Sequence, residues 1–387
     1  GIERFICIKE EYESHNFRQG SLDYGERVDK HMTEVIRRIP KVVLHDHLDG
    51  GLRPTTIIEL VEAAGYDNLP THNPDALKRW FFDAANAGSL PQYISTFEHT
   101  VGVMQTTAAL GRVAREAVID LAEDNVIYAE LRFAPELHQR QGLHLQAIVD
   151  AVADGCRQGE KLAHQQGKEI HARLLLCAMR DGNRSEEIAR LVVDNYGTNS
   201  TVVGFDIAGP EAGYPPEIHA AAFSILRENS IPFTIHAGEA DGVQSVKSAV
   251  SQGAKRLGHG VRIIEDVAND GTLGAVARSV RNGRVVLECC PRSNVQTGAV
   301  AKLSEHPLLQ LEKLGFSCTV NPDNRLVSGT SMSGEMGILV REFDYTLQQL
   351  RKLTVTAMQA AFIDEARKRD ITERLIIPGY ENGIMGI

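Results

Sequence analysis

Two histidines lie two residues apart in the run KVVLHDH, which begins at Lys41. Side chains of an extended strand alternate between its two faces, so His45 and His47 point to the same side, and Asp49 continues that alternation. A neutral imidazole can bind a metal ion, and its charge changes near physiological pH. The pair alone is a weak signal, because strands also carry solvent-facing or hydrogen-bonded histidines.

Further ionisable residues lie where other apolar runs end. His236 ends one run and Glu239 follows it, His259 ends the next, and Asp323 with Asn324 ends the last. Each of these groups is costly to bury without a partner. Imidazole and carboxylate ligands without thiolate suit an ion such as Zn²⁺, which lowers the pKa of its bound water to about 7. We therefore expect a catalytic centre of three histidines and one aspartate that binds a single zinc ion per chain.

Eight apolar runs, several of them rich in β-branched residues, predict the strands that position these side chains. The runs begin at Lys41, Val126, Ala172, Thr201, Pro232, Lys255, Val285 and Ser317. Between them, segments such as ALGRVAREAVIDLAED carry apolar residues at spacings of three and four, as amphipathic helices do. Eight such units predict an α/β fold, a (β/α)₈ TIM barrel, in which the ionisable strand ends share one mouth.

A doubly wound open sheet is the alternative fold. No G-x-G-x-x-G follows the first strand, and no G-x-x-x-x-G-K-[ST] occurs in the sequence. Their absence argues against sites for a dinucleotide or a nucleoside triphosphate of the usual kinds.

The interval between the first two strands is too long for one crossover helix. About 80 residues separate them, so residues 53–121 must hold extra helices over the carboxyl mouth of a barrel. An apolar, mostly aromatic cluster in this interval is interpreted either as a local helix core or as a lid over an aromatic substrate. Its members are Trp80, Phe81, Phe82, Tyr93, Ile94 and Phe97.

Composition excludes several classes of protein. With 43% hydrophobic and 24% charged residues, the 387-residue chain is typical of a globular protein. A net charge of −10 argues against nucleic acid and anionic membranes as partners. The six cysteines are sparse and lack C-x-x-C spacing, so we expect buried thiols and, without a signal peptide or an apolar span, a cytoplasmic location.

We expect one domain over residues 33–387. Residues 1–32 are polar with weak periodicity, and we expect a flexible or cloning-derived extension there. On their strands, Glu130 and Arg132 are expected to form a buried pair or to support the site from behind, and Glu288 to orient a metal-binding histidine. Surface or capping roles are expected for the ten other histidines: His15, His31, His72, His99, His138, His144, His164, His171, His219 and His306.

Six motifs in order resemble the adenosine deaminase family of the amidohydrolase superfamily. They are PKVVLHDHLDGGLRP from Pro40, FDIAGPE from Phe205, TIHAGEADG from Thr234, RLGHGVRI from Arg256, CPRSNVQTGA from Cys290, and NPDNRLVSGTSMS from Asn321. The likeness covers roughly residues 36–370, and the combined set is highly specific. It implies the zinc-dependent deamination of adenosine, and of 2′-deoxyadenosine, to inosine and ammonia.

The resemblance also assigns the catalytic roles. It implies that Glu239 is the acid/base residue, which protonates N1 of the purine, and that His259 with Asp323 positions the hydroxide that attacks C6. The implied zinc ligands are His45, His47, His236 and Asp323.

The remaining assignments concern a purine nucleoside as the small-molecule partner. The resemblance implies that Asp49 holds the ribose, that the Gly209 N–H donates to purine N3, and that Asn324 faces N7. The lid interpretation of the aromatic cluster is favoured for Tyr93, Ile94 and Phe97.

Two rival functions stay open. One is the deamination of another 6-aminopurine, such as a modified adenosine or free adenine, although free-base relatives tend to have Glu in place of Asp49. The other is nucleoside binding without catalysis. Pro322 departs from the Thr common in the family, and because it lacks an N–H it is expected to shift the loop after Asp323 slightly and to alter the rate. The oligomeric state is not predicted.

Overall fold

The computed structural model describes residues 21–197 and 200–385. Its strands are parallel and near-continuously apolar, because both faces of each strand are covered. They begin within two residues of the predicted runs: β1 (Lys41–His47), β2 (Val126–Phe133), β3 (His171–Met179), β4 (Val202–Ala208), β5 (Thr234–Ala237), β6 (Arg256–His259), β7 (Val286–Cys289) and β8 (Cys318–Val320).

The strands follow one another in chain order around a closed ring. Strands β1 to β4 pair in sequence, and so do β5 to β8. Two parallel bridges join the halves, Phe205 with Phe233 and Asp46 with Asp323. Because the second bridge returns to β1, the architecture is the predicted (β/α)₈ barrel and not the open sheet.

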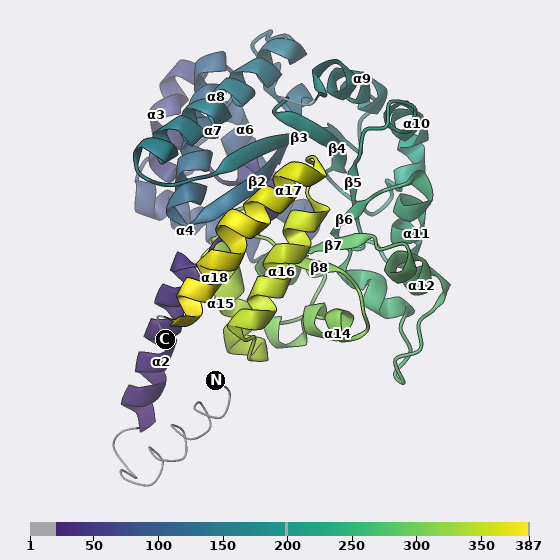
Figure 1. Ribbon diagram of the computed structural model, residues 1–387. Coiled ribbons are helices and arrows are strands. Elements are labelled where there is room, and N and C mark those ends of the chain that lie inside the picture. The colour runs from purple at the N-terminus through teal and green to yellow at the C-terminus, as the bar shows by residue number, and fades with distance from the viewer. Residues whose placement is uncertain (1–20, 198–199, 386–387) are drawn as a thin grey trace.

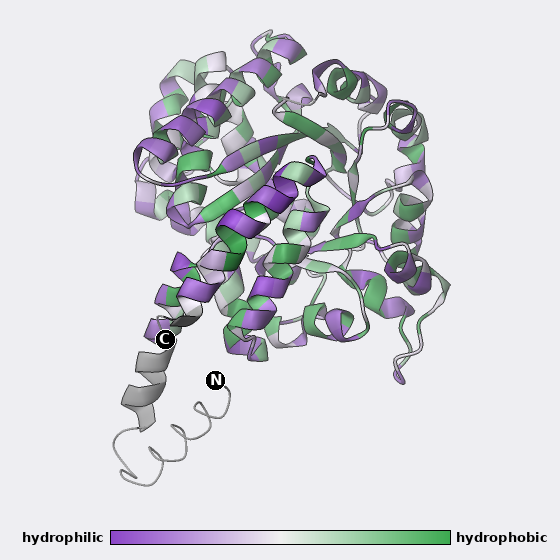
Figure 2. Ribbon diagram, in the orientation of Figure 1, coloured by the Kyte–Doolittle hydropathy of each residue, from purple (hydrophilic) through white to green (hydrophobic). Residues whose placement is uncertain are grey.

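Helices surround the barrel, as Figure 1 shows. In Figure 2 the strands are mostly hydrophobic, whereas the outer helices alternate hydrophobic and hydrophilic residues. The helices are α2 (Ser21–Arg38), α3 (Pro54–Ala64), α4 (Pro74–Ala85), α5 (Leu90–Ser95), α6 (Phe97–Val103), α7 (Thr107–Glu123), α8 (Leu145–Gln165), α9 (Ser185–Asn195), α10 (Ala220–Glu228), α11 (Val243–Gln252), α12 (Ala275–Asn282), α13 (Pro291–Gln296), α14 (Leu308–Lys313), α15 (Met332–Phe343), α16 (Leu347–Ala360), α17 (Glu365–Ile371) and α18 (Ile377–Met385).

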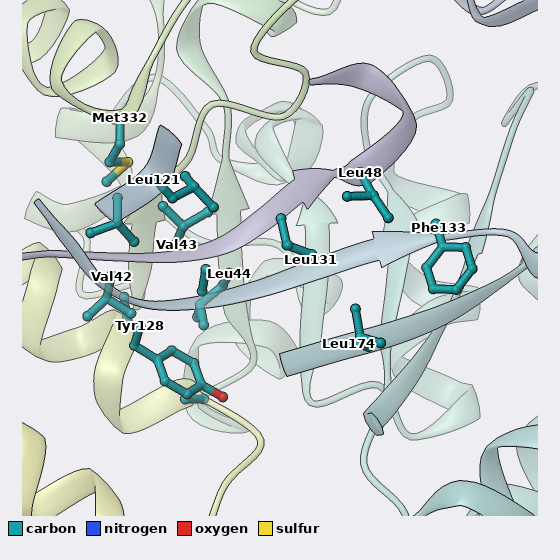
Figure 3. Packing of buried hydrophobic residues seen from close by; sticks show 14 of the residues in the cluster. Val42, Val43, Leu44, Leu48, Leu121, Tyr128, Leu131, Phe133, Leu174 and Met332 are labelled. Atoms are coloured by element: carbon teal, nitrogen blue, oxygen red, sulfur yellow. The ribbon is translucent and has the colours of Figure 1, made fainter. Parts of the chain in front are cut away.

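Local sequence explains why these elements form where they do. Helix α7 begins at Thr106, whose side chain accepts a hydrogen bond from the Ala109 N–H, and it buries apolar residues at helical spacing. Strand β2 is buried along its whole length. Figure 3 shows Leu121 at the end of α7, together with Leu131 of β2, in the packed core beside β1.

The long interval after β1 holds the extra helices α3 to α6, as predicted. Helix α6 packs against α3 and against the turn that follows β1, which keeps this insertion at the carboxyl end of the strands. The inserted helices therefore cover the end of the barrel where the site lies.

The remaining features of the fold are the two ends of the chain and the cysteines. Helix α2 runs through position 32 without a break, and α15 and α18 pack against it; residues 1–20 of the expected extension lie outside the described part. The five cysteines of the described segments are free and buried, as expected. Over those segments, no helix is long and apolar enough to cross a membrane.

Candidate active site

Four side chains from three strands converge at the carboxyl end of the barrel. His45 and His47 lie on β1, His236 lies on β5, and Asp323 lies just after β8. Asp323 Oδ1 is 3.1 Å from His45 Nε2 and 3.4 Å from His47 Nε2. His47 Nε2 in turn is 3.3 Å from His236 Nε2. The predicted ligands therefore form one cluster of imidazole nitrogens and a carboxylate oxygen.

Two buried carboxylates fix the orientation of the imidazoles. Glu288 Oε2 lies 2.9 Å from His45 Nδ1, as predicted, and Asp206 Oδ2 lies 2.7 Å from His236 Nδ1. The His45 contact is a hydrogen bond, whereas His236 Nδ1 meets Asp206 at ion-pair distance without hydrogen-bond geometry. In both, the carboxylate favours a proton on Nδ1, which leaves the Nε2 lone pair to face the cluster. Asp206 was missed as a site residue, although it lies in the motif FDIAGPE.

A buried arginine joins these two carboxylates. Arg132 donates to Asp206 at 2.6 Å and to Glu288 at 2.8 Å, so one guanidinium neutralises both groups behind the histidines. The alternative that Arg132 pairs with Glu130 is wrong, because Glu130 instead accepts from Arg256 and from the Tyr128 hydroxyl. The registers of β2, β6 and β7 decide these partners, and sequence alone does not give them.

The donor set fits a metal ion such as zinc. His45 Nε2 and Asp323 Oδ1 are buried and have no hydrogen-bond partner within the described residues. The Ser293 hydroxyl donates to Asp323 Oδ2, which leaves Oδ1 facing the imidazoles. Ligand atoms of His45, His47 and Asp323 lie within 4.8 Å of one another. Imidazole nitrogens and one carboxylate oxygen at this spacing are a suitable zinc donor set.

His259 satisfies the same distance criterion, but its hydrogen bonding points to another role. Its Nδ1 accepts from the Asn294 side-chain amide at 3.0 Å, so the proton of the neutral ring lies on Nε2, 3.4 Å from Glu239 Oε2. Burial and the nearby His45 lower the pKa of His259 well below its usual value. With its proton on Nε2, a neutral His259 presents a hydrogen-bond donor to the pocket.

Glu239 is held by a network that was not predicted from sequence. The buried Glu211 carboxylate accepts backbone N–H groups from Gly238, Glu239, Ala240 and Asp241, and also the Ser245 hydroxyl. Burial, followed by the nearby carboxylates of Asp323 and Glu211, raises the pKa of Glu239 well above its ordinary range. A protonated carboxyl group is thereby favoured beside the cluster.

Three histidines expected at the surface or at helix ends are buried instead. His138 Nδ1 donates to Met104 O, and His219 lies between the Ser185 hydroxyl and a backbone carbonyl. His306 Nε2 lies 3.0 Å from Asn294 Oδ1, which fixes the amide that holds His259. The expectation fails because a loop sequence does not reveal which residues the tertiary fold covers.

One cavity collects the predicted residues. Eleven of the twelve line it, and the twelfth, His45, is buried beneath. From the lid it is lined by Leu90, Tyr93, Ile94 and Phe97, and from the barrel by residues that sequence analysis missed, including Leu137 and Met179. Its volume of about 110 Å³ is below the roughly 300–1,000 Å³ of ligand pockets, so the cavity walls must part further to admit a nucleoside.

The two interpretations of the aromatic cluster each hold for part of it. Tyr93, Ile94 and Phe97 line the cavity, whereas Trp80 and Phe81 pack against each other and against His99 in a local core. Helical spacing alone cannot distinguish residues that line the cavity from residues of the local core, because both groups are apolar.

Three polar positions complete the cavity. Asp49 lies in the helical turn that follows β1 and not on the strand, yet it still faces the cavity, and burial raises its pKa to about 7. Gly209, with φ of 105°, turns the chain after β4. The Asn324 carboxamide packs so closely on Gly50 that an added Cβ there would lie 1.9 Å from its Oδ1. Gly50 therefore keeps Asn324 at the cavity wall.

The fold and the site define a class of protein. A (β/α)₈ barrel with a histidine–aspartate centre and a buried acid at its carboxyl mouth is the arrangement of a metal-dependent hydrolase. A family model described as Adenosine deaminase matches residues 40–378. The chain belongs to the adenosine deaminase family.

Individual relatives agree with this assignment. The chain is 53% identical to an adenosine deaminase of Mycolicibacterium gilvum, over 90% of this chain and 97% of that protein. It is also 53% identical to adenosine deaminase 1 of Streptomyces coelicolor, over 89% and 88%. A zinc-bound amidohydrolase from Burkholderia ambifaria shares the fold at a TM-score of 0.79 and 21% identity, over 92% and 94%.

Proposed function

We propose that this protein hydrolyses adenosine and 2′-deoxyadenosine to inosine and ammonia, with a zinc ion held by His45, His47, His236 and Asp323. The observation that carries the proposal is that this donor set, Glu239 and His259 meet at one largely apolar pocket, with His45 buried beneath it. The 53% identity to adenosine deaminases over most of the chain supports the same reaction. When bound, the ion supplies water of lowered pKa as the nucleophile.

The chain's own residues supply the proton transfers. Glu239, with its raised pKa, donates a proton to N1 of the purine, which lets the ring accept electron density at C6. His259, as a neutral Nε2–H donor, stabilises the negative oxygen that develops at C6. The side chains of α5 and Phe97 exclude bulk water while ammonia forms.

Asp49 and the amide groups select the substrate. A carboxylate can accept a hydrogen bond from a ribose hydroxyl, and its charge disfavours a 5′-phosphate nearby. The Gly209 N–H is assigned to purine N3. Asn324 is assigned to N7, which requires its Nδ2 to turn from the Tyr93 hydroxyl that it contacts at 2.9 Å.

A substrate panel tests the proposal. Zinc-loaded protein is assayed with adenosine, 2′-deoxyadenosine, adenine, AMP and N6-methyladenosine, and both the change in ultraviolet absorbance and the release of ammonia are followed. Adenosine and 2′-deoxyadenosine should be used best and AMP far less well. If adenine or N6-methyladenosine were turned over faster than adenosine, that compound would be the preferred substrate and the proposal would be wrong.

The Asp49→Ala variant tests the sugar contact separately. It should raise KM for adenosine while changing the slow turnover of adenine little, because adenine has no ribose. Zinc content provides the control for the metal site. Equal losses with both substrates, accompanied by lost zinc, would show that Asp49 supports the metal site instead.

A further inference from the structure

A second and larger cavity opens at the opposite end of the barrel. It lies where the amino ends of β3 to β8 meet the segment 356–368, which runs from α16 through a turn into α17. In Figure 1 these two helices lie across the front of the barrel. The cavity has a volume of about 770 Å³, within the roughly 300–1,000 Å³ of ligand pockets. No residue of the proposed deaminase site lines it.

The lining of this cavity is strongly cationic, although the whole chain has a net charge of −10. One acidic side chain, Asp364, lines it. Against it stand six basic side chains: Arg173, Lys255, Arg256, Arg284, Arg367 and Lys368.

Four of these cations have carboxylate partners. Arg173 contacts Glu160 at 3.3 Å, and Arg256 contacts Glu130 and Glu288. The other two pairs join residues of the segment 356–368 to each other: Arg367 with Asp364 and Lys368 with Glu365. Arg173 nevertheless keeps a buried Nε that has no hydrogen-bond partner within the described residues.

Lys255 and Arg284 differ from the other four. Neither has an ion pair or a side-chain hydrogen bond to any residue of the described segments, and both are exposed at the cavity rim. They lie at the starts of two paired strands: Lys255 precedes β6, and Arg284 lies two residues before Val286 of β7, whose N–H donates to the Lys255 carbonyl. Two exposed cations without counter-ions that line one cavity can bind phosphate groups at low desolvation cost.

The walls also offer an aromatic surface. Tyr196 lines the cavity with 40% of its surface exposed, and Phe362 lines it beside Arg256, whose guanidinium lies 3.7 Å from the ring centroid. Aromatic rings of this kind can stack on a nucleobase. We propose that this cavity binds a nucleotide through its phosphate chain, held by Lys255 and Arg284, at a site distinct from that of the proposed deamination.

Calorimetric titration of the full-length, zinc-loaded protein tests the proposal. The probes are adenosine triphosphate and inorganic tripolyphosphate, with inosine present at saturation to occupy the deaminase pocket. Both should bind, the nucleotide more tightly if the aromatic wall contributes, and binding should weaken as salt is raised. Binding of tripolyphosphate alone would restrict the ligand class to the phosphate chain and overturn the nucleotide part.

Matched variants locate the site. The Lys255→Gln/Arg284→Gln double variant should bind at least tenfold more weakly, while Lys247→Gln, an exposed lysine on α11 away from the cavity, should bind normally. Adenosine turnover and thermal stability of both variants should match the parent. Unchanged affinity in the double variant, or no binding at millimolar nucleotide in the presence of inosine, would overturn the proposal.

Discussion

At the scale of single residues, the site depends on how protons are assigned. Glu288 and Asp206 hold Nδ1 protons on His45 and His236, whereas Asn294 accepts no proton from His259 and donates to its Nδ1. His45 and His236 therefore turn an Nε2 lone pair toward the cluster, whereas His259 turns an N–H toward the pocket. The difference lies in the group that faces Nδ1 of each ring.

Glu239→Gln should retain zinc and the binding of inosine but lose about 10²–10⁴-fold in kcat, because a carboxamide cannot donate and take back the proton. Steady-state kinetics with metal analysis measures this. Turnover within threefold of the parent would remove Glu239 from the acid/base role.

Glu211→Gln tests a positioning residue. An amide NH₂ cannot accept the N–H groups around Glu239, so the loop should shift and kcat should fall by up to about 10²-fold with little change in KM. Because the Glu211 charge helps to raise the pKa of Glu239, the limb of the pH–rate profile governed by Glu239 should also move to lower pH. Lower stability with an unmoved profile would indicate a structural role only.

At the scale of elements, the lid is joined to the barrel by few polar contacts. The Tyr93 hydroxyl of α5 contacts the Ser328 hydroxyl and accepts from Asn324 Nδ2. Apolar side chains make up the rest of the lid lining. Opening therefore requires these hydrogen bonds to break, and they set part of its cost.

Tyr93→Phe should favour the open lid and lower KM for adenosine about three- to tenfold, because the closed form that must open for binding loses neutral hydrogen bonds that each contribute about 0.5–1.5 kcal/mol. Tyr66→Phe is the matched control, since its hydroxyl contacts His99 away from the cavity. An unchanged KM in Tyr93→Phe would show that these bonds do not hold the lid.

Pro322 lies at the junction of β8 and β1. Asn321 N–H donates to Cys289 O on β7, and Asp323 N–H donates to His45 O on β1, so both neighbours are paired without an N–H at position 322. Pro322→Thr should therefore keep its zinc and leave kcat/KM for adenosine level or higher. A severe loss would make Pro322 an adaptation, and the substrate panel would then be repeated on the variant.

At the scale of the whole molecule, the proposed metal site spans the two halves of the barrel. Its donors come from β1 in one half and from β5 and the end of β8 in the other, next to the bridge between Asp46 and Asp323. A ligand that binds only the folded state stabilises it by mass action. Metal binding should thus be coupled to closure of the barrel.

Removing the metal should lower Tm, and equimolar zinc should restore it; stabilisation of about 4 kcal/mol corresponds to zinc at 1,000 times its Kd. Differential scanning calorimetry of the chelated and reloaded protein measures the shift. His236→Ala should melt like the chelated parent and respond little to zinc. Identical melting of the parent with and without zinc would contradict a structural contribution of the site.

The sequence by itself predicted the barrel, which is confirmed, and the residues that meet at its carboxyl mouth. Two local patterns were enough. His45 and His47 are two residues apart, and several ionisable residues end apolar runs. Because side chains alternate along a strand, such spacing fixes which way each of these side chains points. Parallel strands of one barrel bring their carboxyl ends together, so residues almost 280 positions apart could be expected at one mouth.

The tertiary structure alone decided the partners of those residues. Arg132 bridges Asp206 and Glu288, and Glu211 collects the N–H groups of the Glu239 loop, because strand register and loop packing bring them within hydrogen-bond distance. The burial of His306 and the cationic cavity at the amino end likewise arise from elements distant in sequence. Sequence patterns report the direction of a side chain along its own element, whereas the identity of its neighbour depends on how separate elements pack.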